Sequence, residues 1–174
     1  MDFNFTEEQE LLIESVEEFG RRYFDEHTVD AMYTNHGIPV EIAEAYRDAG
    51  FALMGLPEEV GGIPCDKLTL GIMTEKLYHA TGCMTPFMTA MLATADVAEF
   101  GTHDQAMKII EQYAESGMPV ASLGLSEPGA GSDNKAMSTY TKRQKDGTYI
   151  LRGQKTWVTN GGNTPYMIVV AKDE

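Results

Sequence analysis

Residues 123–132, which read LGLSEPGAGS, combine small, polar and glycine residues in a way that could hold a cofactor. Gly129 and Gly131 can turn the backbone with positive φ and let it approach a ligand closely. A run of exposed N–H groups there could bind an anion or the edge of a flavin, and Ser126 and Ser132 add hydroxyl groups. An ordinary loop after a strand is the alternative interpretation of this glycine segment.

A second segment, residues 153–162, reads GQKTWVTNGG and contains the single tryptophan of the chain, Trp157. On a strand, Trp157 and Thr159 would share one face and Val158 would take the other. An indole can cover a planar cofactor ring while the Thr159 hydroxyl reaches a ring nitrogen or oxygen. The alternative interpretation of this tryptophan segment is a core indole beside a hairpin.

Other chemistry is disfavoured by the residue pattern. The glycine segment does not match GxGxxG, because Asn134 takes the place of the third glycine, and no Gly-Lys-Ser/Thr follows it as in a P-loop. Glu127 could resemble a catalytic base, but an acceptor for loop amides is the favoured role. The four histidines and two cysteines lack metal-site spacing, so we expect no metal site and no assigned catalytic residue.

Composition and charge indicate a globular protein without nucleic-acid partners. The net charge is −14, and residues 1–118 contain 22 acidic against 6 basic side chains. Such an acidic surface disfavours binding to nucleic-acid phosphates. The sequence shows no signal peptide and no apolar run that would span a membrane, so a cytoplasmic location is expected.

Apolar spacing of helical type predicts five helices before Pro119. The first follows a capping box at residues 6–9 and has an apolar face made of Leu11, Leu12, Val16, Phe19 and Tyr23. The second opens at Pro39 and stops at Gly50. The others are expected at about residues 67–80, 86–100 and 104–116, with a loop at 56–66.

After Pro119 the pattern changes to short strands. Residues 120–125 form an apolar run typical of a buried strand. Asp146-Gly147 predicts a hairpin between residues 137–144 and 148–153, and a second turn at 160–162 separates residues 155–159 from 166–171. We therefore expect at least four antiparallel strands and two domains, residues 1–118 and 119–174. The fold class is α+β, with an all-α helical domain and an incomplete antiparallel β domain.

The chain resembles the acyl-CoA dehydrogenase family. The resemblance is carried by LSEPGAGSD and GQKTWVTNGG, which occur in this order, and by the N-terminal start MDFNFTEEQELL. It implies an N-terminal helical domain and the first part of the middle β domain, with the family's C-terminal helical bundle absent. It also implies FAD as cofactor. The family's catalytic carboxylate lies in that bundle, so the resemblance implies an inactive chain when taken alone.

The resemblance assigns roles residue by residue. Leu125 and Ser126 would contact the pyrimidine side of the flavin, and Ser132 would also lie near the pantetheine arm of the substrate. Trp157 would shield the ring and Thr159 would bond near its reactive nitrogen. The implied FAD contacts are Leu123, Gly124, Leu125, Ser126, Glu127, Pro128, Gly129, Ala130, Gly131, Ser132, Trp157, Val158 and Thr159. Ser126 replaces a common threonine, and Leu123 replaces an aromatic residue of some members.

These features predict an FAD-dependent acyl-CoA dehydrogenase or enoyl-CoA reductase, with a general similarity to bacterial crotonobetainyl-CoA reductases. The family implies an acyl-CoA thioester as substrate, an electron-transferring flavoprotein as redox partner and a homo-oligomer. Two alternatives remain open at this point. One is a flavin-dependent monooxygenase of the same fold, and the other is a non-catalytic helical interaction module or split-enzyme subunit.

Overall fold

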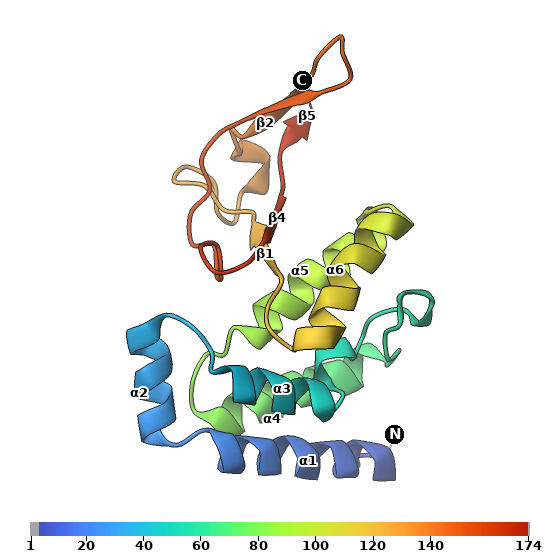
Figure 1. Ribbon diagram of the computed structural model, residues 1–174, viewed down its shortest axis with the longest axis vertical. Coiled ribbons are helices and arrows are strands. Elements are labelled where there is room, and N and C mark those ends of the chain that lie inside the picture. Colours follow the sequence, from blue (N-terminus) through green and yellow to red (C-terminus); the bar gives the residue numbers. More distant parts are fainter. Residues whose placement is uncertain (1–3, 174) are drawn as a thin grey trace.

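Six α-helices and two small sheets make up the computed structural model, which describes residues 4–173. Figure 1 shows the helices gathered at one end and the strands extending away from α5 and α6. The helices are α1 (Glu7–Tyr23), α2 (Glu26–Asn35), α3 (Val40–Asp48), α4 (Lys67–Thr81), α5 (Phe87–Phe100) and α6 (His103–Ser116). The domain division that we proposed at residues 118 and 119 falls in the loop between α6 and β1 (Ala121–Gly124).

Side-chain caps define where several helices begin. Thr6 Oγ1 accepts a hydrogen bond from Gln9 N at 3.2 Å, and Gln9 Oε1 accepts one from Thr6 N at 3.1 Å. This reciprocal arrangement satisfies two N–H groups at the start of α1 and confirms the predicted capping box. Asp66 caps α4 in a similar way through Leu68 N and Thr69 N.

Two details of the helical prediction are wrong. Leu11 is 65% exposed, because it lies roughly 140° around the helix from the buried Val16 at 100° per residue.

The helix α2 was not anticipated. It contains no buried residue, so it lacks the apolar stripe that sequence periodicity detects. Its start is set by Asp25, whose carboxylate accepts a hydrogen bond from Thr28 N at 2.7 Å.

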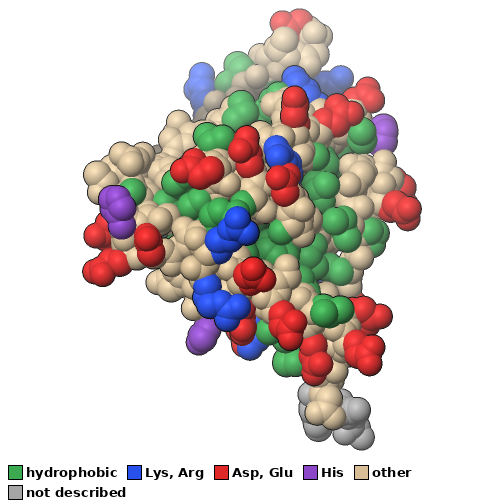
Figure 2. All heavy atoms as spheres, turned by 60° about the horizontal axis from the view of Figure 1, so that its bottom comes forward, with side chains coloured by type: hydrophobic (Ala, Val, Ile, Leu, Met, Phe, Trp, Pro, Cys, Tyr) green, Lys and Arg blue, Asp and Glu red, His purple; other side chains and the backbone are tan. Residues whose placement is uncertain are grey.

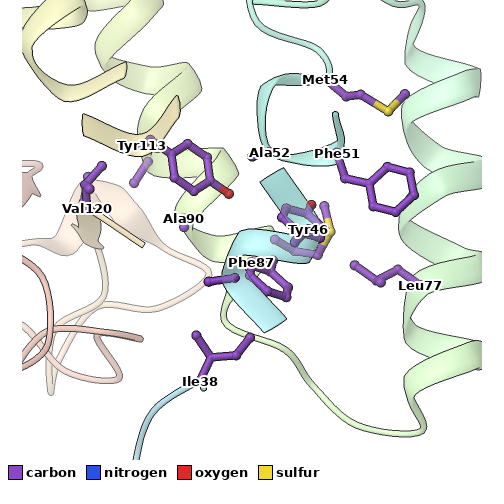
Figure 3. Packing of buried hydrophobic residues seen from close by; sticks show 14 of the residues in the cluster. Ile38, Tyr46, Phe51, Ala52, Met54, Leu77, Phe87, Ala90, Tyr113 and Val120 are labelled. Carbon is purple, nitrogen blue, oxygen red and sulfur yellow. The ribbon is translucent and has the colours of Figure 1, made fainter. Parts of the chain in front are cut away.

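The main core lies between the helices and is rich in aromatic side chains (Figure 3). Tyr46 of α3 and Phe87 of α5 stack with ring centroids 3.9 Å apart and an interplanar angle of 6°. Phe51 meets Tyr46 edge-on at 5.6 Å. Val120 and Ala121 extend this core to the first strand. The start of β1 is therefore anchored in the helical domain.

The helices α1 and α4 approach closely where Gly20 faces Ala80. A Cβ atom at Gly20 would overlap both the side chain and the backbone of Ala80. The close contact thus depends on glycine, although alanine has the higher helix propensity by about 1 kcal/mol.

We expect Gly20→Ala to lower the free energy of unfolding by about 1–3 kcal/mol, since overpacking outweighs the gain in propensity. Gly71→Ala in α4 is the matched control, because a Cβ there has no neighbour within 4 Å. The control should stabilise the protein by roughly 0.5–1 kcal/mol. Urea unfolding followed by circular dichroism measures both, and equal stabilisation by the two variants would contradict the proposed contact.

The strands form one two-stranded and one three-stranded sheet. The strand β1 pairs with β4 (Tyr166–Val169) in parallel. The strand β2 (Tyr140–Arg143) pairs with β3 (Tyr149–Arg152) in an antiparallel hairpin and with β5 (Lys172–Asp173) in parallel. The hairpin at Asp146-Gly147 and the buried first strand are confirmed. The α+β class is also confirmed, whereas the expectation of a wholly antiparallel set of strands is wrong.

The parallel pairing has a physical cause that local sequence does not contain. Residues 155–159 form no strand, so the chain from β3 to β4 crosses over through a long irregular segment instead of returning by a tight turn. The connection from β1 to β4, which includes β2 and β3, is long enough for β4 to lie beside β1 in the same direction. The turn at Asn160-Gly161-Gly162 exists, but it precedes β4 without joining two paired strands.

Candidate functional site

The structure brings the glycine segment and the tryptophan segment side by side. Thr156 N donates a hydrogen bond to Ser126 O at 2.9 Å. Lys155 Nζ donates to Leu125 O at 2.9 Å. We refer to residues 123–132 and 155–159 together as the wall. The wall is thus held by contacts between two segments roughly 30 residues apart, without a regular sheet between them.

Glu127 lies inside the wall and serves as an acceptor, as predicted. Its carboxylate accepts hydrogen bonds from Ser138 N at 2.6 Å, Ser138 Oγ at 2.8 Å and Thr139 N at 2.9 Å. It also forms an ion pair with Lys155 Nζ at 2.8 Å. Because these groups occupy both of its oxygens, Glu127 is a structural residue here and is not available as a base.

Lys155 is the residue of the wall that the sequence analysis missed. Only 7% of its side chain is exposed, against 3% for Glu127. Lysine side chains are mostly exposed in folded proteins, so the sequence around Lys155 predicts a surface position and not a buried one. The available signal was the acidic residue in the glycine segment, which needs a positive partner if it is buried.

The pKa of Glu127 is held well below its ordinary value by the Lys155 ammonium, with further lowering from the hydrogen bonds of Thr139 and Ser138. A carboxyl whose folded-state pKa is depressed stabilises the fold above its unfolded-state pKa, about 4.3 for glutamate. That contribution is lost as the pH falls through the folded-state pKa.

We therefore expect the free energy of unfolding to decrease with acid below about pH 4.3 more steeply in the wild type than in Glu127→Gln. The glutamine cannot ionise, so it removes this one contribution while the other carboxylates continue to titrate. Urea unfolding at several pH values measures the two slopes. Parallel curves for the two proteins would show that Glu127 is not paired in the folded state.

The glycines of the first segment do not have the backbone conformation expected from the sequence. Neither Gly129 nor Gly131 has a positive φ, which corrects that expectation. A Cβ atom at either position would meet nothing within 4 Å. Pro128 and Gly129 are exposed, while Ala130 is buried and pairs with Glu127 through a β-bridge. Neither conformation nor packing within the described chain requires these glycines, so their small size leaves room for a molecule beside them.

Trp157 is neither on a strand nor in a core. Its φ is 57° and its side chain is 92% exposed. The left-handed conformation costs a bulky residue about 1–2 kcal/mol. It also changes the direction of the chain, and Trp157 and Thr159 both face outward while Val158 is half-buried. The expected strand is wrong because the backbone turns here, and the core interpretation of the indole is excluded by its exposure.

Several backbone N–H groups of the wall have no acceptor in the described part of the chain. They belong to Leu125, Ser126, Trp157, Val158 and Thr159. Such groups require a hydrogen-bond partner when they are covered. Together with the open glycines and the exposed indole, they offer hydrogen-bond donors and an aromatic face to a molecule with several acceptor atoms. The ring system of a flavin has this chemistry.

A cavity of about 160 Å³ lies next to Thr159 and Asn160. Its other side is formed by α2 and by the loop before α5, and its lining contains no lysine, arginine, aspartate or glutamate. Thr85, which lines it, is 3% exposed and its hydroxyl has no partner among the described residues. Apolar spacing does not indicate this cavity, because α2, which lines it, has no buried stripe. The lining residues are Val29, Met32, Tyr33, His36, Gly37, Cys83, Met84, Thr85, Pro86, Thr89, Thr159 and Asn160.

The surface of the helical domain agrees with the charge pattern of the sequence. Figure 2 shows acidic side chains spread over the helical face, with few basic ones between them. No helix within residues 4–173 is long and apolar enough to cross a membrane. In the same range, no cluster of three His, Cys, Asp or Glu side chains is arranged to hold a metal ion.

Comparison with known proteins assigns the family. The N-terminal domain of acyl-CoA dehydrogenase matches residues 6–117, and the middle domain matches residues 122–174. The probable acyl-CoA dehydrogenase YdiO of Escherichia coli K12 is 39% identical over 99% of the chain and 45% of the relative. The chain therefore spans about half the length of the curated relatives it matches.

Solved structures show the same fold. Butyryl-CoA dehydrogenase of Megasphaera elsdenii superposes with a TM-score of 0.74 at 27% identity, over 98% of this chain and 45% of that one. The FAD complex of PigA superposes with a TM-score of 0.82 at 24% identity, over 100% of this chain and 46% of that one. By its domains and by its fold, the chain belongs to the acyl-CoA dehydrogenase family.

Proposed function

We propose that the chain provides the flavin-facing wall of an FAD-dependent acyl-CoA dehydrogenase or enoyl-CoA reductase. The observation that carries the proposal is the exposed indole of Trp157 beside a row of backbone N–H groups without acceptors. A large exposed aromatic residue in a strained backbone conformation is unusual unless a ligand or partner uses it. PigA, which has the same fold, has been solved with FAD.

The residues of the wall divide the work of holding FAD. The N–H groups of Leu125 and Ser126 would donate to the pyrimidine oxygens and nitrogen, with the Ser126 hydroxyl as an additional partner. Trp157 would cover one face of the ring and exclude water and oxygen from it. Thr159 would donate its hydroxyl near the ring nitrogen that accepts hydride. FAD itself supplies the hydride acceptor for the β-carbon of an acyl thioester.

We further propose that the acyl group enters the cavity beside Thr159. A lining without charged side chains suits an apolar or uncharged acyl chain, and the unpartnered Thr85 hydroxyl can accept or donate one hydrogen bond within it. Ser132, which is exposed at the edge of the glycine segment, would contact the pantetheine arm. With these two proposed contacts, the thioester would lie between the cavity and the outer surface.

Removal of the α-proton requires a general base, which the family resemblance implies is a carboxylate. Glu127 is fully engaged with Lys155 and the loop amides, so the wall contains no free carboxylate for this step. The family resemblance implies that the base comes from a C-terminal helical domain. We accordingly propose that the 174-residue chain is inactive by itself and binds FAD weakly. We also propose an electron-transferring flavoprotein as redox partner, a homo-oligomeric assembly and a cytoplasmic location.

The test is a chimera that joins residues 1–174 to the remaining part of the Escherichia coli relative. We expect it to retain stoichiometric FAD after gel filtration and to reduce an artificial electron acceptor with acyl-CoA, whereas the chain alone does neither. Peroxide formation in air without transfer to the acceptor would favour the flavin-dependent monooxygenase instead. A folded chimera that holds no FAD would contradict the proposal, as would acyl-CoA oxidation by the chain alone.

A further inference from the structure

The largely buried side chain of Lys155 forms hydrogen bonds to two residues of the glycine segment. Its Nζ atom donates to Leu125 O at 2.9 Å and to Glu127 Oε1 at 2.8 Å. Gly124 makes room for the lysine stem, because a Cβ atom there would lie 3.3 Å from Lys155 Cγ. The next residue, Thr156, donates its N–H to Ser126 O. Two consecutive residues are therefore fixed to the glycine segment immediately before Trp157.

The other side of Trp157 is fixed to the helical domain. Asn160 Nδ2 donates to Pro86 O at 3.4 Å, and Asn163 Nδ2 donates to His36 O at 2.5 Å. Between these two anchors, the N–H groups of residues 157–159 donate to no described atom. This stretch is thus held at its ends and is open along its length.

The strain at Trp157 requires an explanation from its surroundings. A bulky residue stays in the left-handed region only when the neighbouring structure fixes it there. The indole is 92% exposed, so packing of the Trp157 side chain cannot supply that constraint. The hydrogen bonds before and after Trp157 can supply that constraint. The stronger of these contacts is the buried, charged one through Lys155.

We propose that Lys155 and Glu127 are positioning residues that hold the backbone of residues 157–159 in its binding conformation. Their ion pair fixes the two segments of the wall as one unit, so that the indole and the open N–H groups face the same ligand. The identity of that ligand as FAD rests on the proposed function. The statement about the backbone does not, since it concerns only contacts within the chain.

A purely stabilising role makes a different prediction, because a buried ion pair is often replaceable by neutral residues without loss of stability. If the pair only stabilised the fold, any neutral replacement that restores stability would also restore the wall. If it positions the wall, the bond from Lys155 to Leu125 O is needed in addition. A neutral replacement should then restore the free energy of unfolding without restoring the order of residues 157–159.

The measurement is the ¹⁵N order parameter of the Trp157, Val158 and Thr159 amides in the 174-residue chain. We expect values near 0.85 in the wild type and below about 0.6 in Lys155→Met, with the helices unchanged. The double variant Glu127→Gln/Lys155→Met leaves no buried charge unpaired. Its unfolding free energy should therefore be close to that of the wild type, while the order parameters of residues 157–159 stay low. Ile110→Val, on the buried face of α6, should reduce stability without changing the order parameters.

The outcomes decide between the two roles. Low order parameters in the double variant together with recovered stability support the positioning role. This comparison remains valid if Lys155→Met alone does not fold. Recovery of order together with stability, or unchanged order in both variants, overturns the proposal. Titration of the chimera with FAD, followed by the flavin absorbance retained after gel filtration, is a separate readout. Absence of FAD binding in every protein would overturn the proposed function and leave the positioning role standing.

Discussion

Replacement of Trp157 by alanine should weaken FAD binding by roughly 30-fold or more, which corresponds to about 2 kcal/mol or more. The fold should be almost unaffected, with a change in unfolding free energy within about 0.5 kcal/mol, because a 92% exposed side chain contributes little packing. The substitution does not remove the backbone strain at position 157, since alanine also disfavours the left-handed conformation. The chimera with the Escherichia coli relative allows both quantities to be measured on one protein.

Thr159→Val provides the graded comparison for this prediction. Valine keeps the shape of threonine and removes one hydroxyl, so the loss of affinity should be about 0.5–1.5 kcal/mol. Peroxide release after reduction should increase in Trp157→Ala and remain low in Thr159→Val, since only the indole shields the ring. A Trp157→Ala protein that melts at a lower temperature but binds FAD normally would contradict the assigned role of the wall.

Replacement of Phe87 by alanine should have the largest effect on stability, a loss of about 3–5 kcal/mol. Phe87 is completely buried and stacks on Tyr46, so its removal leaves a cavity between α3 and α5. Phe87 also directly follows Pro86 in the loop that lines the cavity beside Thr159. We therefore expect acyl-CoA affinity in the chimera to decrease along with stability.

Phe100→Ala is the control for this substitution, because Phe100 ends the same helix and is 78% exposed. The same chemical change should there alter the unfolding free energy by no more than about 0.5 kcal/mol. Urea unfolding of both variants provides the comparison. Similar losses at the two positions would show that the aromatic stack does not organise the core.

The sequence was informative wherever a local rule controls the structure. The capping box at Thr6 and the Asp146-Gly147 hairpin depend on residues within one turn, and both are present. The role of Glu127 as an acceptor was predicted from the loop around it and is confirmed. The family was recognised from the glycine and tryptophan segments, and the domain matches confirm it.

Prediction failed where distant contacts override local preference. Residues 155–159 have the β-branched and aromatic content of a strand. Their backbone nevertheless turns at Trp157, in a segment tied to the glycine segment through Lys155 and to the helical domain through Asn160. The helix α2 is set by its cap and lacks a buried stripe. Neither its existence nor the cavity that it lines could be inferred from apolar spacing.

We expect the parallel pairing of β1 with β4 to influence the order in which this protein folds. Ala121 pairs with Tyr166, so this ladder closes a loop that contains the hairpin and both segments of the wall. Closing a long loop has an entropic penalty, and non-local contacts of this kind form slowly compared with helical ones. The helices and their aromatic core can collapse before the ladder exists. Refolding should therefore show a fast helical phase and a slower phase in which the Trp157 signal reaches its final value, so that a newly made chain is compact before it is competent to bind its cofactor.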